Sequence, residues 1–298
     1  MDDLRRMAVF AAVVEQRSMS AAARALHMST SAVSQQVRAL ERSGGVTLLH
    51  RTTRKLTLTD AGERFYVECA GMVAAARRAQ AQLALSRDAP SGELRLAATV
   101  GFARHVAPAL GGLLAANPAL TLKLLVDDAR IDLIESRIDL GVRFGTLADS
   151  SWVARRLCRF EWLLCAAPAY LQRHGTPQRP EDLLAHQWLA LARDGNAMTL
   201  QLSNGQTHTL RLEARITSNN QLSLQQMCVA GLGLARLARV DVDEELRAGR
   251  LVPVLPAWAQ EPLPVWAVTP QRDAQPAKVR HAVEALHAYL LTLPGALN

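Results

Sequence analysis

A pair of short helices joined by a three-residue link is the feature that most constrains the fold of this chain. Hydrophobic periodicity predicts three helices near the N-terminus, over 4–16, 19–26 and 30–43. Either Ser29 or Thr30 can cap the third helix, and Gly44-Gly45 ends it. Two helices with so tight a link predict a helix-turn-helix, the motif whose second helix enters the major groove of DNA.

The third helix has an outer face that lacks acids. Val33, Val37 and Leu40 recur at i, i+4 and i+7 and form an inward stripe. The other side presents hydroxyl, amide and guanidinium groups, on Ser31, Ser34, Gln35, Arg38 and Arg42. Such a face fits contact with a polyanion, although a solvated helix face or a capping hydroxyl also explains each residue taken singly. The lone acid, Glu41, lies near the helix end and need not face DNA.

Each polar residue of this face has an expected role. The base readers are expected at the N-terminal end, at Thr30, Ser31, Ser34 and Gln35. Gln can pair with adenine and Ser can serve either base of a pair, whereas Arg38 is placed to contact phosphate. Alternating residues around Leu56 and Leu58 predict a two-stranded wing, whose Arg51 and Arg54 can reach phosphates or the minor groove. The charge agrees, since residues 1–60 hold nine Lys and Arg against five Asp and Glu, +4 of the total +7.

A long helix follows the wing and runs to the hinge SRDAPSG at 86–92. Asp60 and Glu63 are spaced as a capping box at its start. Its apolar or small residues form a heptad seam: Phe65, Cys69, Met72, Ala76, Ala79 and Leu83. The seam favours pairing with a second copy of the chain, and packing on its own domain is the alternative.

Beyond residue 92 the sequence alternates between strand and helix patterns. Strands are predicted over 93–100, 120–127, 139–145, 160–167, 211–218 and 262–269. Helices are predicted over 102–118, 130–137, 180–187, 222–237 and 277–293. This alternation predicts parallel sheets covered by helices, and about 200 residues favour two α/β lobes around a cleft.

Three loops of this α/β body are candidates for a ligand site, because ligands of open α/β sheets bind beyond the carboxyl ends of strands. The residues are Thr99, Val100, Gly101 and Phe102, then Arg143 and Phe144, then Ser218, Asn219 and Asn220. Amide groups at a helix start, with Ser and Asn beside them, suit a carboxylate. Helix capping by Ser218 or Asn219, and pairing of Arg143 with a nearby acid, are the alternatives.

Composition and motifs exclude several other classes of protein. No apolar run reaches the ~20 residues of a membrane helix and the N-terminus does not read as a signal peptide, so a cytoplasmic protein with no membrane contact is expected. The four cysteines are widely spaced, which predicts reduced structural thiols and no metal site. The sequence lacks HExxH, G-x-S-x-G and a P-loop, and GLGLAR is weak evidence for a dinucleotide, so neither an enzyme nor a cofactor is expected. A redox-responsive regulator that uses Cys228 remains an alternative.

The ordered motifs resemble those of the LysR-type transcriptional regulators over essentially the whole chain. They are FAAVVEQRSMSAAARALHMSTSAVSQQVRALE, HRTTRKLTLTDAG, the long helix, DLGVRFG, PAYLQRHGTPQRPEDLLAHQWL, AGLGLARL and LRAGRLVPVLPAW. The resemblance implies a winged helix-turn-helix at 1–59, a linker and dimerisation helix at 60–88, and an effector domain at 89–298 similar to type 2 periplasmic binding proteins. Lobe I of that domain is expected at about 92–160 and 266–298, and lobe II at about 161–265.

The resemblance also implies partners. It implies a homodimer or homotetramer that binds inverted repeats in double-stranded promoter DNA and responds to a small-molecule effector, such as an organic or amino acid. RNA polymerase is a further candidate partner. The chain departs from the family pattern at Gly44, where an apolar residue is usual, and at Leu49, where Phe is usual. Both departures lie next to the wing and predict a shift in DNA affinity.

Overall fold

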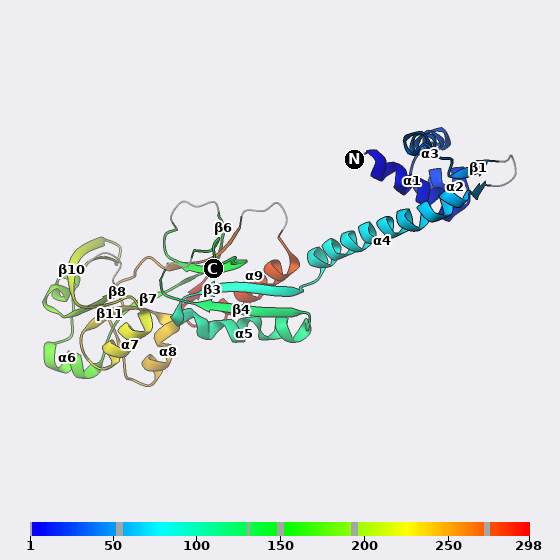
Figure 1. Cartoon of the computed structure of the whole chain (residues 1–298). Coiled ribbons are helices and arrows are strands. Elements are labelled where there is room, and N and C mark those ends of the chain that lie inside the picture. Colours follow the sequence, from blue (N-terminus) through cyan, green and yellow to red (C-terminus); the bar gives the residue numbers. More distant parts are fainter. Residues whose placement is uncertain (1, 52–55, 130–131, 148–151, 192–195, 271–274) are drawn as a thin grey trace. The chain divides into compact units, whose positions relative to one another are not determined.

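The computed structural model describes residues 2–51, 56–129, 132–147, 152–191, 196–270 and 275–298. The chain divides into two compact units, Met1–Leu85 and Ser86–Asn298 (Figure 1).

The first unit is a winged helix-turn-helix followed by a long helix, as predicted. Its elements are α1 (Asp2–Gln16), α2 (Met19–Ala25), α3 (Thr30–Gly44), β1 (Leu49–Arg51), β2 (Leu56–Leu58) and α4 (Asp60–Asp88). The core joins α1 to α3, because Phe10, Val13, Val33 and Val37 are fully buried in one cluster. Leu49 packs in the same cluster at 2% exposure, so leucine is accommodated in the core at this wing position.

Two serines start the helices of the motif. Ser18 Oγ accepts the amide of Ala21 at 3.3 Å, and Ser29 Oγ accepts the amide of Ala32 at 3.1 Å. The N-cap of α3 is therefore Ser29, and Thr30 is its first helical residue. Gly45 ends α3 in the left-handed conformation, at φ 64°, which a glycine adopts without strain.

The start of α4 differs from the prediction of a capping box at Asp60 and Glu63. Thr59 fills the capping role, because its Oγ1 accepts the amide of Gly62 at 2.9 Å. The same hydroxyl donates to the carbonyl of Thr47 at 2.8 Å. Asp60 lies one position inside the helix, where its charge faces the positive end of the helix dipole.

The second unit contains two six-stranded sheets, which define lobe I and lobe II. The lobe I sheet has the order β14-β6-β13-β5-β3-β4. Its elements are β3 (Gly92–Ala98), α5 (Val100–Ala116), β4 (Leu120–Val126), β5 (Leu140–Phe144), β6 (Trp152–Phe160), β13 (Leu263–Pro270), α9 (Ala277–Leu290) and β14 (Ala296–Leu297). Leu110 of α5 and Leu286 of α9 are fully buried with strand residues in one cluster, so both helices cover this sheet.

The lobe II sheet has the order β12-β7-β11-β8-β10-β9 and is covered on both faces. Its elements are β7 (Trp162–Ala166), α6 (Pro168–His174), the 3-10 helix η1 (Pro180–Ala185), β8 (Trp188–Leu191), β9 (Ala197–Ser203), β10 (Thr207–Ser218), α7 (Gln221–Val229), β11 (Leu234–Ala238), α8 (Arg239–Arg247) and β12 (Val252–Val254). Trp188 packs with Tyr170 of α6 in one core, whereas its neighbour Leu189 packs with Leu224 of α7 in another. Successive strand residues point to opposite faces, so one strand serves two helical layers.

The prediction of parallel sheets was wrong for part of each sheet. In lobe I, β3 is parallel to β4 and β5, but β13 is antiparallel to β5 and β6. Parallel pairing needs a crossover connection, usually a helix. β13 instead enters lobe I from lobe II, after residues 161–262, and lies between β5 and β6, antiparallel to both.

Two predicted helices are absent or shorter. Within 130–137, residues 133–137 form a turn and no helix: the Asp132 carboxylate caps its start by accepting the amides of Ile134 and Glu135, and Arg137 at φ 50° ends it. The pattern over 222–237 contains α7 and then β11, separated by a turn in which Gly231 has φ 75°. A Cβ at Gly233 would lie 2.6 Å from the carbonyl oxygen of Gln187, so this turn runs against a neighbouring strand.

Two other segments also differ from their predictions. The strand predicted at 160–167 is the end of β6 and all of β7, and the helix predicted at 180–187 is the 3-10 turn η1.

Candidate functional site

The N-terminal half of α3 forms an exposed polar surface. Thr30, Ser31, Gln35 and Arg38 are exposed, and Ser34 is half-buried. Ser31 Oγ lies 3.0 Å from Ser29 Oγ, so its hydroxyl is linked to the helix cap. The first acid of the helix is Glu41, in its fourth turn. These side chains are therefore gathered at one end of α3, with donors and acceptors of the kinds that read base edges.

The two wing arginines are less fully described. Arg51 is the last residue of β1, and its backbone pairs with Leu56 of β2. Arg54 lies outside the described residues. The hairpin that carries both of them follows α3 directly along the chain, as the winged motif requires.

Glu41 has a structural role that its position in the sequence did not suggest. Its Oε1 accepts the amide of Leu48 at 2.9 Å and the amide of Leu49 at 3.2 Å. The carboxylate thus ties the end of α3 to the first strand of the wing. An unpaired backbone amide at this half-buried point costs free energy, so the contact fixes the path between helix and strand.

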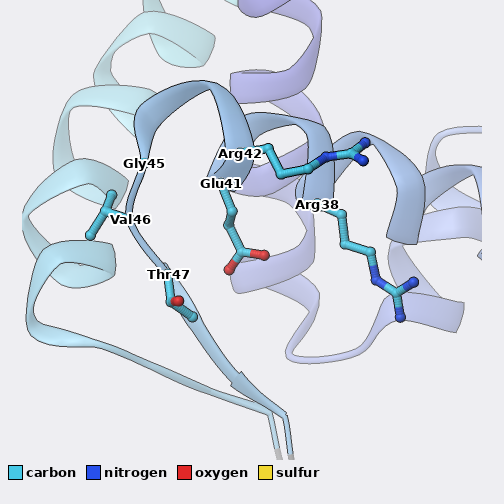
Figure 2. A pocket seen from close by; sticks show the side chains of 6 residues that line it. All are labelled: Arg38, Glu41, Arg42, Gly45, Val46 and Thr47. Carbon is cyan, nitrogen blue, oxygen red and sulfur yellow. The ribbon is translucent and has the colours of Figure 1, made fainter.

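A hollow lies beside this contact and is lined by Arg38, Glu41, Arg42, Gly45, Val46 and Thr47. Glu41 extends toward the segment that carries Thr47, whereas the side chains of Arg38 and Arg42 extend away from it (Figure 2). Arg38 and Arg42 are exposed and four residues apart, so they lie on one side of the helix. Two guanidinium groups so placed suit phosphate.

Gly62 allows α4 to approach the wing closely. A Cβ at this position would lie 2.1 Å from the carbonyl oxygen of Leu48, a distance that no side chain tolerates. Leu48 O also accepts the amide of Thr59 at 3.0 Å. The segment of Thr47 and Leu48 is therefore held from one side by Glu41 of α3 and from the other by the start of α4.

The seam of α4 divides into two parts. Phe65 and Cys69 pack inside the first unit, where the ring centroids of Phe65 and Phe10 are 5.6 Å apart and Cys69 is 2% exposed. Met72 is half-buried, whereas Ala76, Ala79 and Leu83 are exposed, Leu83 by 73%. Phe65 and Cys69 therefore pack on their own domain, which was the alternative to pairing with a second copy. Ala76, Ala79 and Leu83 form an exposed apolar stripe.

The expected ligand-binding loops lie at the starts of two helices in the second unit. Thr99 is the N-cap residue of α5 and Asn220 is the N-cap residue of α7. Val100 and Asn219 are exposed, and the described side chains of Thr99 and Ser218 are half-buried. Gly101 is half-exposed in the first turn of α5. Ser218 Oγ accepts the amide of Asn220 at 3.1 Å, so this hydroxyl supports the turn before α7.

The aromatic pair of the predicted site is structural. Phe102 is 3% exposed and packs edge-on against Phe144, with ring centroids 5.7 Å apart. Arg143 is half-buried on β5, and its Nη1 donates to the carbonyl of Val142 at 3.2 Å. Phe102 is thus buried and Arg143 and Phe144 are half-buried, and their part in ligand binding stays a prediction.

Asp128 connects the two expected loops. Its Oδ1 accepts the amide of Val100 at 3.0 Å, and its Oδ2 accepts Nδ2 of Asn220 at 2.5 Å. Asp128 follows β4 of lobe I, whereas Asn220 precedes α7 of lobe II. Residues 99–101, 128 and 218–220 are thereby brought together at a junction of the two lobes.

Two family models match most of the chain. Residues 4–63 match a model described as bacterial regulatory helix-turn-helix protein, lysR family, and residues 87–291 match the LysR substrate binding domain. The chain belongs to the LysR family of transcriptional regulators. Its winged helix-turn-helix and its two-lobed α/β unit are the two domains of that family.

Relatives of this LysR-type regulator match it over nearly their full lengths. It is 36% identical over 293 residues to the HTH-type transcriptional activator AaeR of Escherichia coli (strain K12), 98% of this chain and 95% of that protein. It is 37% identical over 292 residues to the HTH-type transcriptional regulator DmlR of the same strain, 97% and 94% of the two chains. The full-length structure of the Vibrio cholerae virulence activator AphB, a member of the LTTR protein family, superposes with a TM-score of 0.75 and 28% identity, covering 96% of this chain and 99% of that one.

The family assignment agrees with the chemistry of the described residues. LysR-type proteins are transcriptional regulators and not enzymes. Within the described ranges, no group of three or more His, Cys, Asp or Glu is arranged to hold a metal ion. Neither α4 nor any other described helix has the length and apolar character of a membrane span.

The environments of the four cysteines favour the protonated thiol. All four are buried, and burial raises the pKa of Cys158, Cys165 and Cys228 to about 12. Cys228 Sγ donates to the carbonyl of Cys165 at 3.3 Å. A buried thiol that stays protonated is a poor nucleophile, so the environment of Cys228 does not favour redox sensing.

Three residues of the two sites were missed by the sequence interpretation: Glu41, Thr59 and Asp128. Glu41 was assigned no contact, and its helix position gave no sign of bonding to a strand. Thr59 precedes the acid that was taken as the cap, and the residue three positions after Thr59 is Gly62 and not Glu or Gln, so no capping-box pattern begins at Thr59. Asp128 stands next to Asp127 in a loop, with no local signal that separates their roles.

Proposed function

We propose that this LysR-type regulator reads promoter DNA with the N-terminal half of α3 and anchors on phosphates with Arg38, Arg51 and Arg54. The observation that carries the proposal is the exposed, acid-free start of α3, where Ser29 caps the helix and Thr30, Ser31 and Gln35 follow on the surface. The positive end of the helix dipole faces outward at the same end, which favours approach to a phosphate backbone.

The roles of the α3 residues follow from their chemistry. The Gln35 amide can donate and accept at once, which matches the N6 and N7 edge of adenine. Arg38 lies about one turn after Gln35 and lines the hollow of Figure 2. A guanidinium group at this point contacts the phosphate backbone of DNA and does not read its sequence. Ser31 is linked to Ser29, so its hydroxyl combines a structural and a reading role.

Variants at Gln35 and Arg38 test this division. Gln35→Ala should change base preference at one or two positions of the site, whereas Arg38→Ala should weaken all sequences similarly and lower the slope of affinity against salt by about 1. Footprinting and salt titration on the promoter beside the gene measure both. Gln16→Ala, at the end of α1, is a matched polar control outside the surface. Equal, sequence-independent losses for both α3 variants would remove the assigned role of Gln35.

The effector binds, in this proposal, at the lobe junction where α5 and α7 begin. LysR-type regulators bind small-molecule effectors through the domain that residues 87–291 match. Thr99, Val100, Gly101, Ser218 and Asn219 surround the point where Asp128 joins the lobes. A ligand that changes this junction changes the relative placement of the lobes and so the output at the promoter.

A thermal-shift screen tests the placement of the effector. Small organic and amino acids, amides and amines are added to the wild type, Thr99→Val and Asn219→Ala. The ligand-induced rise in Tm should be lost in both variants. A full response in both variants would place the effector elsewhere.

A second copy of the chain completes the regulator. LysR-type regulators form oligomers, and the exposed stripe of Ala76, Ala79 and Leu83 on α4 suits a pairing helix. Two paired reading helices match the two halves of an inverted repeat, and pairing through further contacts gives the homotetramer.

A further inference from the structure

Asp128 bonds to both lobes with the two oxygens of one carboxylate. Oδ1 accepts the amide of Val100, the first residue of α5 in lobe I, at 3.0 Å. Oδ2 accepts the side-chain amide of Asn220, the N-cap of α7 in lobe II, at 2.5 Å. Charged acceptors make stronger hydrogen bonds than neutral ones, so this single residue is a link between the lobes.

Asn220 is held in the orientation that this link requires. Its Oδ1 accepts the amide of Ser223 at 2.8 Å and the hydroxyl of Ser223 at 3.1 Å. With the oxygen committed to the cap of α7, the nitrogen must face Asp128. The side chain therefore serves the helix and the lobe contact together.

The carboxylate of Asp128 also replaces a missing cap. Thr99 is the N-cap residue of α5 but makes no capping bond with its side chain. Asp128 supplies the acceptor for the first amide of α5 from the neighbouring loop. A negative charge at this position is favoured by the dipole of a 17-residue helix. The adjacent Asp127 makes a different bond, since its Oδ1 accepts the nearby amide of Ala129 at 2.8 Å.

We infer that the carboxylate of Asp128 itself fills the acid-accepting position, which is the place at the lobe junction where the first amide of α5 could otherwise bind the carboxylate of a ligand. An effector that binds there therefore presents a hydrogen-bond donor, either a hydroxyl or an amine, to Asp128. An acid ligand would have to displace an intramolecular carboxylate and face its charge. A donor avoids both costs, because each Asp128 oxygen accepts one of these two hydrogen bonds and has a second lone pair. The ligand class rests on the proposed function, but the link between the lobes does not.

Chemical rescue tests the acid-accepting position. In the full-length protein, Asp128→Ala removes the carboxylate and leaves a space of its size. We expect this variant to lose about 2–8 °C in Tm. Sodium formate or acetate should restore part of that loss, relative to sodium chloride at equal ionic strength, and should leave the wild type unchanged. Absence of rescue, or equal rescue of the wild type, would overturn the inference.

Asp127→Ala is the matched control, because it removes the same charge from the adjacent residue. Its stability should not respond to formate. Should Asp128→Ala fail to fold, Asp128→Asn keeps the shape and loses the charge. Hydrogen exchange should then be faster, on the order of tenfold, at Val100 and in the first turn of α7. Unchanged exchange in Asp128→Asn would overturn the inference as well.

A pair of two-carbon probes tests the ligand class. Ethanolamine carries a hydroxyl and an amine, and glycolate carries a hydroxyl and a carboxylate. Ethanolamine should raise the Tm of the wild type, and glycolate should do so only in Asp128→Ala. No effect of ethanolamine, or a response of the wild type to glycolate, would overturn the ligand class.

Promoter binding by the same variants separates this inference from the proposed function. An electrophoretic shift that fails in the wild type would remove the DNA-binding proposal, while formate rescue would still decide the role of Asp128. Intact promoter binding and effector response, without formate rescue, would overturn the role of Asp128 alone.

Discussion

The carboxylate of Glu41 accepts the backbone amide of Leu48 at 2.9 Å, so the only acid in α3 holds the wing rather than facing DNA. The residue next to Leu48 is bonded to the same oxygen, at 3.2 Å. Glu41 thereby joins the end of α3 to the wing by two hydrogen bonds. A change at Glu41 should affect DNA binding through the wing, without touching a base.

Glu41→Ala should destabilise the first unit by about 1–3 kcal/mol, because two backbone amides lose their acceptor. Glu41→Gln keeps an acceptor oxygen and should lose less. Thermal unfolding measures the stability, and DNA titration should show a loss that is similar for all sequences. Glu63→Ala, an exposed acid at the start of α4, makes the same charge change as a control. Equal stability of Glu41→Ala and Glu63→Ala would contradict the role of Glu41.

Gly62→Ala should be strongly destabilising, by several kcal/mol, since its Cβ would overlap the Leu48 carbonyl oxygen at 2.1 Å. Gly71→Ala lies on the same helix with nothing within 4 Å of the added Cβ. That control should gain about 0.5–1 kcal/mol, because alanine is a better helix former than glycine. The unfolding midpoints of the two variants should move in opposite directions. A shift of the same sign in both would refute the close approach of α4 to the wing.

Local chemistry explains why the DNA-binding unit could be predicted from the sequence. The stripe of Val33 and Val37, the three-residue link and the glycines after α3 each act within a few residues. Even there, the choice between Ser29 and Thr30 as the cap needed the structure. Serine and threonine are both good caps, and the hydrogen bond from the Ala32 amide to Ser29 Oγ identifies Ser29 as the cap.

Contacts between residues far apart in the sequence explain why the second unit was predicted less completely. The bond between Asp128 and Asn220 joins positions 92 residues apart, and that between Arg104 and Asp241 joins positions 137 apart. No periodicity reports such pairs. The antiparallel strands of lobe I arise in the same way, since β13 returns from lobe II to lie between β5 and β6. The strand-end rule selects the loops before α5 and α7 as candidates, but it does not reveal that Asp128 bonds to both of them.

Charges on the α4 stripe should weaken association of the regulator. Ala79→Glu and Leu83→Glu place carboxylates on the proposed seam, where each copy would face the other. We expect the dissociation constant of the pair to rise on the order of 10–100-fold. This rise corresponds to the free energy lost when one leucine side chain is no longer buried. Sedimentation velocity over a concentration series measures it. Ala81→Glu adds the same charge on the side of α4 opposite the seam and should sediment like the wild type. Unchanged sedimentation of both seam variants would place the pairing surface elsewhere.

His105 should make the second unit sensitive to mild acid. Burial, with Arg104 beside the ring, lowers its pKa to about 4 from 6.5. The unfolded state therefore takes up the proton first, and stability is lost as pH falls from 6.5 toward 4, by about 3 kcal/mol in all. His105→Gln should flatten this part of the pH profile of the unfolding free energy. His281→Gln, at an exposed position on α9, should leave the profile unchanged. If the unfolding free energy of His105→Gln falls with pH as steeply as that of the wild type, His105 contributes nothing to the acid sensitivity.

Cys165 and Cys228 should not react with Ellman's reagent in the folded protein at pH 7. Burial raises the pKa of both thiols to about 12, so only about one in 10⁵ is a thiolate at that pH. Both pKa values lie above the ordinary 9.0 of a thiol. The contribution of the two protonated thiols to the free energy of unfolding is therefore full below pH 9 and is lost as pH rises toward 12. A Gln206→Cys variant supplies an exposed thiol in the same chain as a fast reference. Labelling of Cys228 at the rate of that reference would restore redox sensing as a function of this regulator.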